Sequence, residues 1–136
     1  MIEKIASEEG FRKTLYECTA GKQTIGYGFN LEADGIPEPV ARYWLQYNIN
    51  HLRAVLAGFD FYDGLDEARK TVLVDMAYQM GVSGMLRFKS MIKDIKVGAW
   101  DSAAKSLLDS KYARDSPNRA KRNAETMRTG IIKLNT

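Results

Sequence analysis

The chain has 136 residues, a length typical of one domain whose core is large enough to fold without a metal or disulfide. Its composition, 45% hydrophobic and 27% charged, is that of a globular protein. One cysteine, Cys18, and one histidine, His51, exclude an intrachain disulfide and a Cys/His zinc cluster, and any histidine-based mechanism must use His51. Carboxylates, hydroxyls and the Cys18 thiol remain as candidate reactive groups.

Positive charge is concentrated in the second half of the chain, although the net charge is only +3. Residues 1–68 hold 6 Lys/Arg and 11 Asp/Glu, whereas residues 69–136 hold 14 Lys/Arg and 6 Asp/Glu. A basic half attracts anionic polymers such as nucleic acid, anionic lipid or cell-wall glycan. An ordinary solvent-exposed helical surface is also rich in basic residues. Charge alone favours such a surface over a binding site for an anionic polymer.

The first 39 residues predict a helix, a β-hairpin and a loop. A helix over residues 1–9, ending at Gly10, is predicted because four residues share one helical face: Ile2, Ile5, Ala6 and Glu9. Residues 14–30 predict the hairpin, with its turn at residues 20–22 and period-two alternation over residues 24–29. Glycine and proline predict a loop over residues 31–39.

From residue 38 onward the periodicity is helical. A long helix is predicted by an apolar stripe of Ala41, Leu45, Ile49, Leu52 and Leu56, and a turn follows over residues 58–64. Asp66 is a candidate cap for the next helix, and Ser116 for the last, which has Pro117 in its first turn. Helices are therefore expected at about residues 66–80, 86–97, 100–108 and 117–130.

The order of these elements predicts an α+β fold that is mainly α. A small N-terminal lobe with a β-hairpin sheet, at about residues 10–35, is joined by a long helix, at about residues 38–58, to a helical lobe. The helical lobe takes in residues 65–136 and the N-terminal helix 1–9, and the whole chain is one domain. We expect a cleft between the lobes, where ligands tend to bind.

Glu9 stands out because it is a carboxylate on an apolar helical face, next to the helix end. Partial desolvation there favours the neutral form and a role as general acid. The alternative is a solvent-exposed glutamate at a frayed helix end. Periodicity alone does not favour either the general acid or the exposed residue.

The hairpin is unusual because Thr24, Gly26 and Gly28 share one face of the predicted strand. Glycine inside a strand marks either close approach of a ligand or a bulge, and the bulge is the more common case. Thr24 adds a hydroxyl that is able to hold a water molecule. Cys18 lies in the preceding strand, and a lone cysteine is more often a small buried hydrophobe than a nucleophile.

Together these residues resemble the catalytic signature of the T-even phage lysozyme family. The signature is Glu9, eight residues, Cys18, five residues and Thr24, and family members have Asp or Cys at the second position. The sequences at 78–81, 116–122 and 128–130 are similar to the helical lobe of that family in order and spacing. The resemblance covers nearly the whole chain and weakens over residues 31–64, where this chain is shorter than the best-known member.

The resemblance implies a lysozyme-like fold and a muramidase that needs no cofactor and no metal. The enzyme would cleave the β-1,4 bond between N-acetylmuramic acid and N-acetylglucosamine in peptidoglycan. Glu9 would protonate the leaving oxygen, while Thr24 and the residue at position 18 would handle the attacking water. Family members invert the anomeric centre, which requires room for a water between acid and base.

Cys18 leaves two mechanisms open, because a thiol is a poorer base than a carboxylate unless it is ionised. A thiolate at this position acts either as the base or as a nucleophile that attacks the sugar. We favour the base, because the family motif accepts Asp or Cys at the same spacing.

Further residues follow from the resemblance alone. Arg119 is expected to pair with Glu9 across the cleft and to favour its ionised form, with a surface arginine as the alternative. The family positions that line the sugar sites correspond to Asn30, Tyr78, Met91 and Ser106. Tyr78 is the best candidate among them, because an aromatic ring stacks on a sugar face, and core packing is its alternative.

The basic half of the chain is expected to draw the enzyme to an anionic cell wall or to lipopolysaccharide. Its densest part contains Lys111, Arg114, Arg119, Lys121, Arg122 and Arg128. Two other functions stay open: a catalytically weak domain that binds cell wall, and a module that binds nucleic acid, for which no recognition helix is evident.

Location and assembly are predicted from weaker signals. No apolar run approaches the ~20 residues of a membrane span. Residues 1–9 alternate charged and apolar side chains, unlike a secretory signal. We therefore expect a monomer that stays in the host cytoplasm until it is released to the cell wall, where it lyses the bacterium for a phage.

Overall fold

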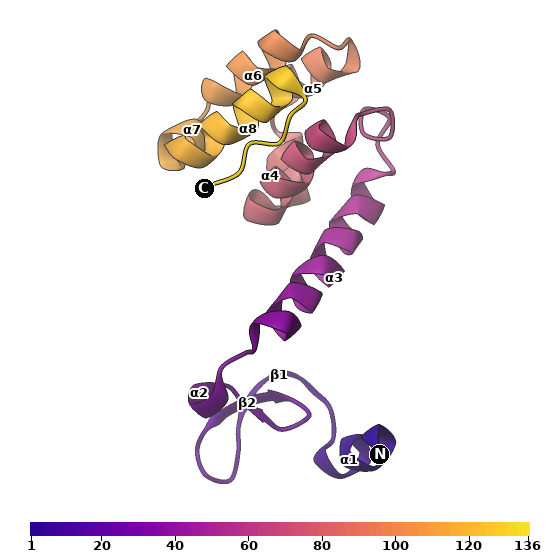
Figure 1. Ribbon diagram of the computed structural model, residues 1–136, viewed down its shortest axis with the longest axis vertical. Coiled ribbons are helices and arrows are strands. Elements are labelled where there is room, and N and C mark those ends of the chain that lie inside the picture. Colours follow the sequence, from indigo (N-terminus) through magenta and orange to yellow (C-terminus); the bar gives the residue numbers. More distant parts are fainter. The chain divides into compact units, whose positions relative to one another are not determined.

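The computed structural model describes residues 1–136 and divides the chain into two compact units, Met1–Leu45 and Gln46–Thr136. Mainly helical structure with one small sheet confirms the predicted fold class. The elements can be followed in chain order in Figure 1. Inclusion of the N-terminal helix in the helical lobe remains a prediction.

The first unit contains a three-stranded antiparallel sheet in the order β1-β2-β3. Its elements are α1 (Ile2–Glu9), β1 (Arg12–Glu17), β2 (Gln23–Gly26), β3 (Phe29–Asn30) and α2 (Leu31–Asp34). Helix α1 and the hairpin confirm the sequence prediction. Thr24 of the central strand lies opposite Tyr16 on one side and Asn30 on the other.

Two predictions for this unit were wrong in detail. The strand expected over residues 24–29 ends at Gly26, because Gly26 and Gly28 adopt positive φ angles of 69° and 77° and turn the chain into β3. The expected loop after residue 30 begins with helix α2. Asn30 caps this helix, and its side-chain oxygen accepts a hydrogen bond from Ala33 N at 3.1 Å.

The predicted long helix is α3 (Glu38–Leu56), which has 19 residues and continues from the first unit into the second. Leu56, at its C-terminal end, is buried in the core of the second unit. The turn that follows leads to Asp66, whose carboxylate accepts a hydrogen bond from Arg69 N and caps α4, as predicted.

Five helices follow α3 in the second unit: α4 (Glu67–Leu86), α5 (Lys89–Lys96), α6 (Trp100–Leu108), α7 (Lys111–Asp115) and α8 (Pro117–Thr129). Gly81, with a φ of 80°, kinks α4. The sequence did not predict α7, which Ser110 caps. Ser116 precedes α8 as predicted, but it makes no capping hydrogen bond, and its hydroxyl accepts a hydrogen bond from Gln79 Nε2 at 3.1 Å.

The hydrophobic core lies in the second unit, where α6 packs against α5 and α8. Eight large side chains are almost completely removed from solvent: Leu56, Val72, Leu73, Met76, Met85, Met91, Leu107 and Met127. Half of them are methionines, which are flexible enough to fill irregular gaps. No helix of the chain combines the length and apolar character required to cross a bilayer.

Candidate active site

The first unit brings the Glu9 side chain against the turn between β2 and β3. A Cβ atom built on Gly28 would lie 2.7 Å from Glu9 Oε2 and 3.4 Å from Glu9 Cδ. A side chain at this position would have to push the Glu9 carboxyl aside, and the positive φ of 77° at Gly28 also favours glycine. The sequence marked Gly28 as an open position on a strand, and the structure shows that the Glu9 carboxyl occupies the space there. Glu9 itself is exposed, and α1 has no buried residue.

Thr24 is the one buried residue of the first unit, with 3% of its surface exposed. The pairing of β2 with both neighbouring strands encloses it. Its hydroxyl donates a hydrogen bond to the carbonyl oxygen of Lys22 at 2.9 Å. This bond fixes the Oγ1 atom beside the β1–β2 turn and leaves its lone pairs free to accept a further hydrogen bond.

Cys18 is half-buried at the start of the same turn. Its amide donates to Lys22 O at 2.9 Å, and its carbonyl accepts from Gly21 N at 2.8 Å. Hydrogen bonding from the backbone of Lys22, then of Ala20, and from the Thr24 side chain lowers the pKa of the thiol below its usual value. This environment stabilises a thiolate. It differs from the buried apolar surroundings that are expected when a lone cysteine serves only as a small hydrophobic residue.

Cys18, Lys22 and Thr24 thus form one local arrangement, which we call the thiol turn. Sequence spacing suggested Cys18 and Thr24 as partners, but the backbone contribution of Lys22 was not foreseen. The short turn at Thr19–Gly21 could have indicated this contribution, because tight turns expose backbone N–H groups that can donate to a thiolate. Chemically, a stabilised thiolate beside a fixed hydroxyl is able to orient and deprotonate a water molecule.

Arg119 lies in the second unit and forms an ion pair with Asp75 of α4. Its Nε and Nη2 atoms donate to the two carboxylate oxygens at 3.0 and 2.6 Å, and Asn123 Nδ2 donates to the same carboxylate at 2.8 Å. Burial works to raise the pKa of Asp75, but hydrogen bonds from Arg119 and Asn123 outweigh it and leave the pKa below its usual value. Sequence reasoning missed Asp75, and the pairing of Arg119 with Glu9 remains a prediction.

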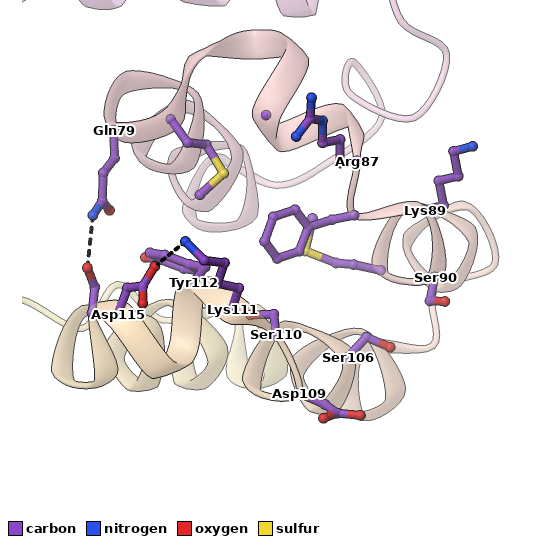
Figure 2. Close-up of a pocket in the computed structure, with 15 residues that line it drawn as sticks. Gln79, Arg87, Lys89, Ser90, Ser106, Asp109, Ser110, Lys111, Tyr112 and Asp115 are labelled. Atoms are coloured by element: carbon purple, nitrogen blue, oxygen red, sulfur yellow. Dashed lines mark hydrogen bonds and ion pairs between the residues drawn. The ribbon is translucent and has the colours of Figure 1, made fainter.

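A pocket of about 640 Å³ lies in the second unit between the end of α4, the start of α5 and helix α7 (Figure 2). Two predicted sugar-binding residues, Met91 and Ser106, line it. Met91 is fully buried in the core, so it forms part of the pocket floor, whereas Ser106 is half-buried. An apolar floor with a polar rim is typical of ligand sites.

The rim of this pocket carries several charged and polar groups. Lys111 pairs with Asp115 at 3.0 Å, and Gln79 donates to Ser116, as the dashed lines in Figure 2 show. Arg87 has no acidic partner in the structure. The pocket therefore offers both hydrogen-bonding and charged groups to a ligand.

The other two predicted sugar-binding residues do not line this pocket. Tyr78 is 51% exposed on α4, which excludes the alternative that it packs in the core. Asn30 lies in the first unit, where its side-chain oxygen caps α2, and its amide hydrogens make no hydrogen bond in the structure.

The predicted basic cluster is partly neutralised. Lys111, Arg119 and Arg128 pair with Asp115, Asp75 and Glu125. The other three members have no salt-bridge partner in the structure: Arg114, Lys121 and Arg122. The charge available to attract an anionic surface is therefore smaller than the sequence count suggests.

Comparison with known proteins identifies relatives over most of the chain. The family model for phage lysozyme matches residues 6–125. Probable T4-type lysozyme 2 of Dictyostelium discoideum is 36% identical over 93% of this chain and 92% of its own length. Probable T4-type lysozyme 1 of that organism is 37% identical over 52% of this chain and 42% of its own length. The pre-baseplate central spike protein Gp5 of Enterobacteria phage T4 is 32% identical, and the alignment covers 97% of this chain and 28% of Gp5.

Proposed function

The chain belongs to the phage lysozyme family, and from this membership we propose that it is a lysozyme-type glycosidase that hydrolyses peptidoglycan. The bond it cleaves is the β-1,4 linkage between N-acetylmuramic acid and N-acetylglucosamine. The observation that carries the proposal is the contact of the Glu9 carboxyl with Gly28, in the turn that follows the strand bearing Thr24.

Glu9 is the general acid of the proposed reaction. In its protonated form it donates a proton to the glycosidic oxygen as the bond to the anomeric carbon breaks, so that the leaving sugar departs as a neutral alcohol. Because Gly28 has no side chain, the carboxyl is able to lie against the turn between β2 and β3 while it does so.

Cys18 and Thr24 handle the attacking water. The Cys18 thiolate takes a proton from the water, and the water oxygen bonds to the anomeric carbon from the face opposite the leaving group, which inverts the configuration. The Thr24 hydroxyl, with its proton turned to the thiolate, accepts a hydrogen bond from the same water. The lowered pKa of the Cys18 thiol supports this assignment, because it increases the fraction of thiolate near neutral pH.

The remaining assignments rest on the family resemblance and on exposure. Tyr78, Asn30 and Ser106 contact the glycan, and Met91, which is fully buried, supports the floor of the pocket in the second unit. Arg119 is the electrostatic partner that the family resemblance assigns to Glu9, whereas in the structure its guanidinium is bound to Asp75. The protein acts as a monomer that reaches the wall from the host cytoplasm during lysis by a phage, and its unpaired cations contact the anionic envelope.

The proposal is tested by the loss of turbidity of a purified peptidoglycan suspension. We expect lysis by the wild type, none by Glu9→Gln, full or increased lysis by Cys18→Asp and at least tenfold less by Cys18→Ala. Retention on the wall without lysis by the wild type would favour a binding domain instead.

The stereochemistry is tested separately by NMR of the product anomers. An initial product that is entirely the α-anomer agrees with inversion, whereas a β-anomer indicates double displacement through a Cys18 glycosyl intermediate. Full activity of Cys18→Ala would contradict both roles of the thiol.

A further inference from the structure

Glu32 of α2 binds the backbone directly beside the thiol turn. Its Oε1 atom accepts a hydrogen bond from Gln23 N at 3.0 Å, and its Oε2 atom lies 3.9 Å from Lys22 Nζ. The side chains of Glu32 and Lys22 are both half exposed, so their ion pair contributes little. The hydrogen bond to the amide is the stronger contact, because a bond from N–H to a carboxylate is stronger than one between neutral groups.

The end of β3 explains why a side chain binds this amide. Strand β3 ends at Asn30, which lies opposite Thr24 of β2. The chain then turns into α2, so that no residue of β3 lies opposite Gln23. Glu32, in the first turn of α2, supplies the acceptor instead. Its carboxylate takes the place that a backbone carbonyl would have in a longer strand.

The amide that Glu32 binds belongs to the same peptide group as the carbonyl of Lys22. The Lys22 oxygen accepts hydrogen bonds from Cys18 N and from Thr24 Oγ1, each at 2.9 Å. Because a peptide group is planar, its N–H and C=O ends move together. The bond to Glu32 therefore also fixes the carbonyl to which Cys18 is bound, and it polarises that carbonyl so that it accepts hydrogen bonds more strongly.

We propose that Glu32 is a positioning residue for the reaction, which through the peptide group of residues 22–23 holds Cys18 and Thr24 in the arrangement that handles the attacking water. This inference rests on the proposed function, because it takes the roles of Cys18 and Thr24 from it. In this role Glu32 acts through the backbone and neither donates nor accepts a proton in the reaction. The lowered pKa of the Cys18 thiol agrees with the proposal, since its largest cause is a hydrogen bond from the backbone of Lys22.

Two substitutions separate the hydrogen bond of Glu32 from its charge. Glu32→Gln removes the charge and keeps an oxygen at the same reach, so it still accepts from Gln23 N. Glu32→Asp keeps the charge, but its side chain is shorter by a methylene group and no longer reaches the amide. Glu38→Asp is the matched control, because it makes the same change at an exposed glutamate of the same unit that forms no salt bridge in the structure.

The hydrogen bond itself is measured by NMR detection of amide exchange in the full chain. In Glu32→Asp we expect the amides of Gln23 and Cys18 to exchange about fivefold faster than in the wild type, the size expected for loss of one exposed hydrogen bond. The pKa of the Cys18 thiol, followed by its ultraviolet absorbance, should rise at the same time. In Glu32→Gln and Glu38→Asp both exchange rates should stay within about twofold of the wild type.

Catalysis is measured on soluble glycan strands of alternating N-acetylglucosamine and N-acetylmuramic acid. We expect Glu32→Asp to lower kcat about fivefold with KM within about twofold, because the attacking water is positioned less well while glycan binding is unaffected. Glu32→Gln should keep kcat within about twofold of the wild type, because it restores the acceptor for the amide. Glu38→Asp should match the wild type in both constants.

Unchanged kcat in Glu32→Asp overturns the positioning role, and faster amide exchange alone would then show a purely structural contact. A loss of kcat in Glu32→Gln as large as that in Glu32→Asp assigns the effect to charge and overturns it as well. If the wild type does not lyse peptidoglycan, the proposed function fails, but amide exchange and the thiol pKa still decide whether Glu32 holds the thiol turn. Lysis by the wild type with no effect of Glu32→Asp refutes the role of Glu32 alone.

Discussion

Arg119 and Asp75, which are 44 residues apart in the sequence, form a bidentate ion pair. Arg119 Nε and Nη2 each donate a hydrogen bond to a different oxygen of the Asp75 carboxylate. Asn123 donates to the same carboxylate and also to the Tyr112 hydroxyl, at 2.9 Å. The pair thus joins α4 and α8 within a network of hydrogen bonds. Such networks are costly to break, because the group left behind is partly desolvated.

Removal of the Asp75 charge should destabilise the second unit. We expect Asp75→Asn to lower the free energy of unfolding by about 1–3 kcal/mol at pH 7, because Arg119 loses its charged partner and one of its two acceptor oxygens while it remains half-buried. Urea denaturation followed by circular dichroism measures the change. Asp115→Asn is the control: its pair with Lys111 is exposed on both sides, so we expect less than about 1 kcal/mol.

The same pair predicts acid sensitivity. Because the folded pKa of Asp75 lies below its unfolded value, its contribution to stability is complete above about pH 4 and is lost as pH falls through the folded pKa. The wild type should therefore lose more stability between pH 5 and pH 2 than Asp75→Asn does, by roughly the difference seen at pH 7. Parallel pH profiles of the two proteins would contradict this assignment.

Gly28→Ala should impair catalysis more than folding. The new Cβ would displace the Glu9 carboxyl from its position, and we expect kcat/KM to fall by about 100-fold, as for other small misplacements of a catalytic group. Gly21→Ala is the matched control. Gly21 has a similar φ of 75° but no atom within 4 Å of the added methyl group, so this variant carries the backbone strain alone. Equal activity losses in the two variants would mean that strain, and not the Glu9 contact, is responsible.

Thr24→Val should raise the pKa of the Cys18 thiol, because the Thr24 side chain helps to stabilise the thiolate. A hydroxyl has one proton, so Thr24 must turn it from Lys22 O to the sulfur when the thiolate forms. The pH dependence of the ultraviolet absorbance of the thiolate measures the change. Thr24→Ser keeps the hydroxyl and should retain the lowered pKa. A Thr24→Val profile that coincides with the wild type contradicts the interaction.

The unpaired cations of the second unit predict salt-dependent lysis. We expect the lytic rate on whole cell walls to fall as ionic strength rises, since attraction between exposed charges is screened beyond about 10 Å at 0.1 M salt. Arg114→Glu combined with Lys121→Glu should reduce both the rate at low salt and its salt dependence, with stability within about 0.5 kcal/mol of wild type. A rate that is flat across ionic strength excludes electrostatic attraction.

The sequence predicted the long elements because their signals are local. Apolar periodicity located α3, α4 and α6, and Asp66 correctly marked the start of α4. The short helices α2 and α7 were missed, because each depends on a single cap, Asn30 or Ser110, and is too short for periodicity to show.

The sequence predicted which residues form the candidate site but not the contacts that they make. Spacing identified Glu9, Cys18 and Thr24, but the contact of Glu9 with Gly28 depends on the turn after β2, whose positive φ angles end the strand earlier than alternation suggests. The partner of Arg119 lies on another helix, and no local pattern encodes such a pairing. Long-range contacts of this kind are set by packing and not by periodicity.

The four methionines of the helical core allow the opening of the core to be followed by methionine oxidation. Met76, Met85, Met91 and Met127 are fully shielded from solvent. Peroxide converts an accessible thioether into a polar sulfoxide that does not fit an apolar core. The rates at which these methionines are oxidised therefore report how often the core opens to solvent. Replacement of the methionines by leucine would make the core resistant to oxidation, but it would also replace flexible side chains by stiffer ones.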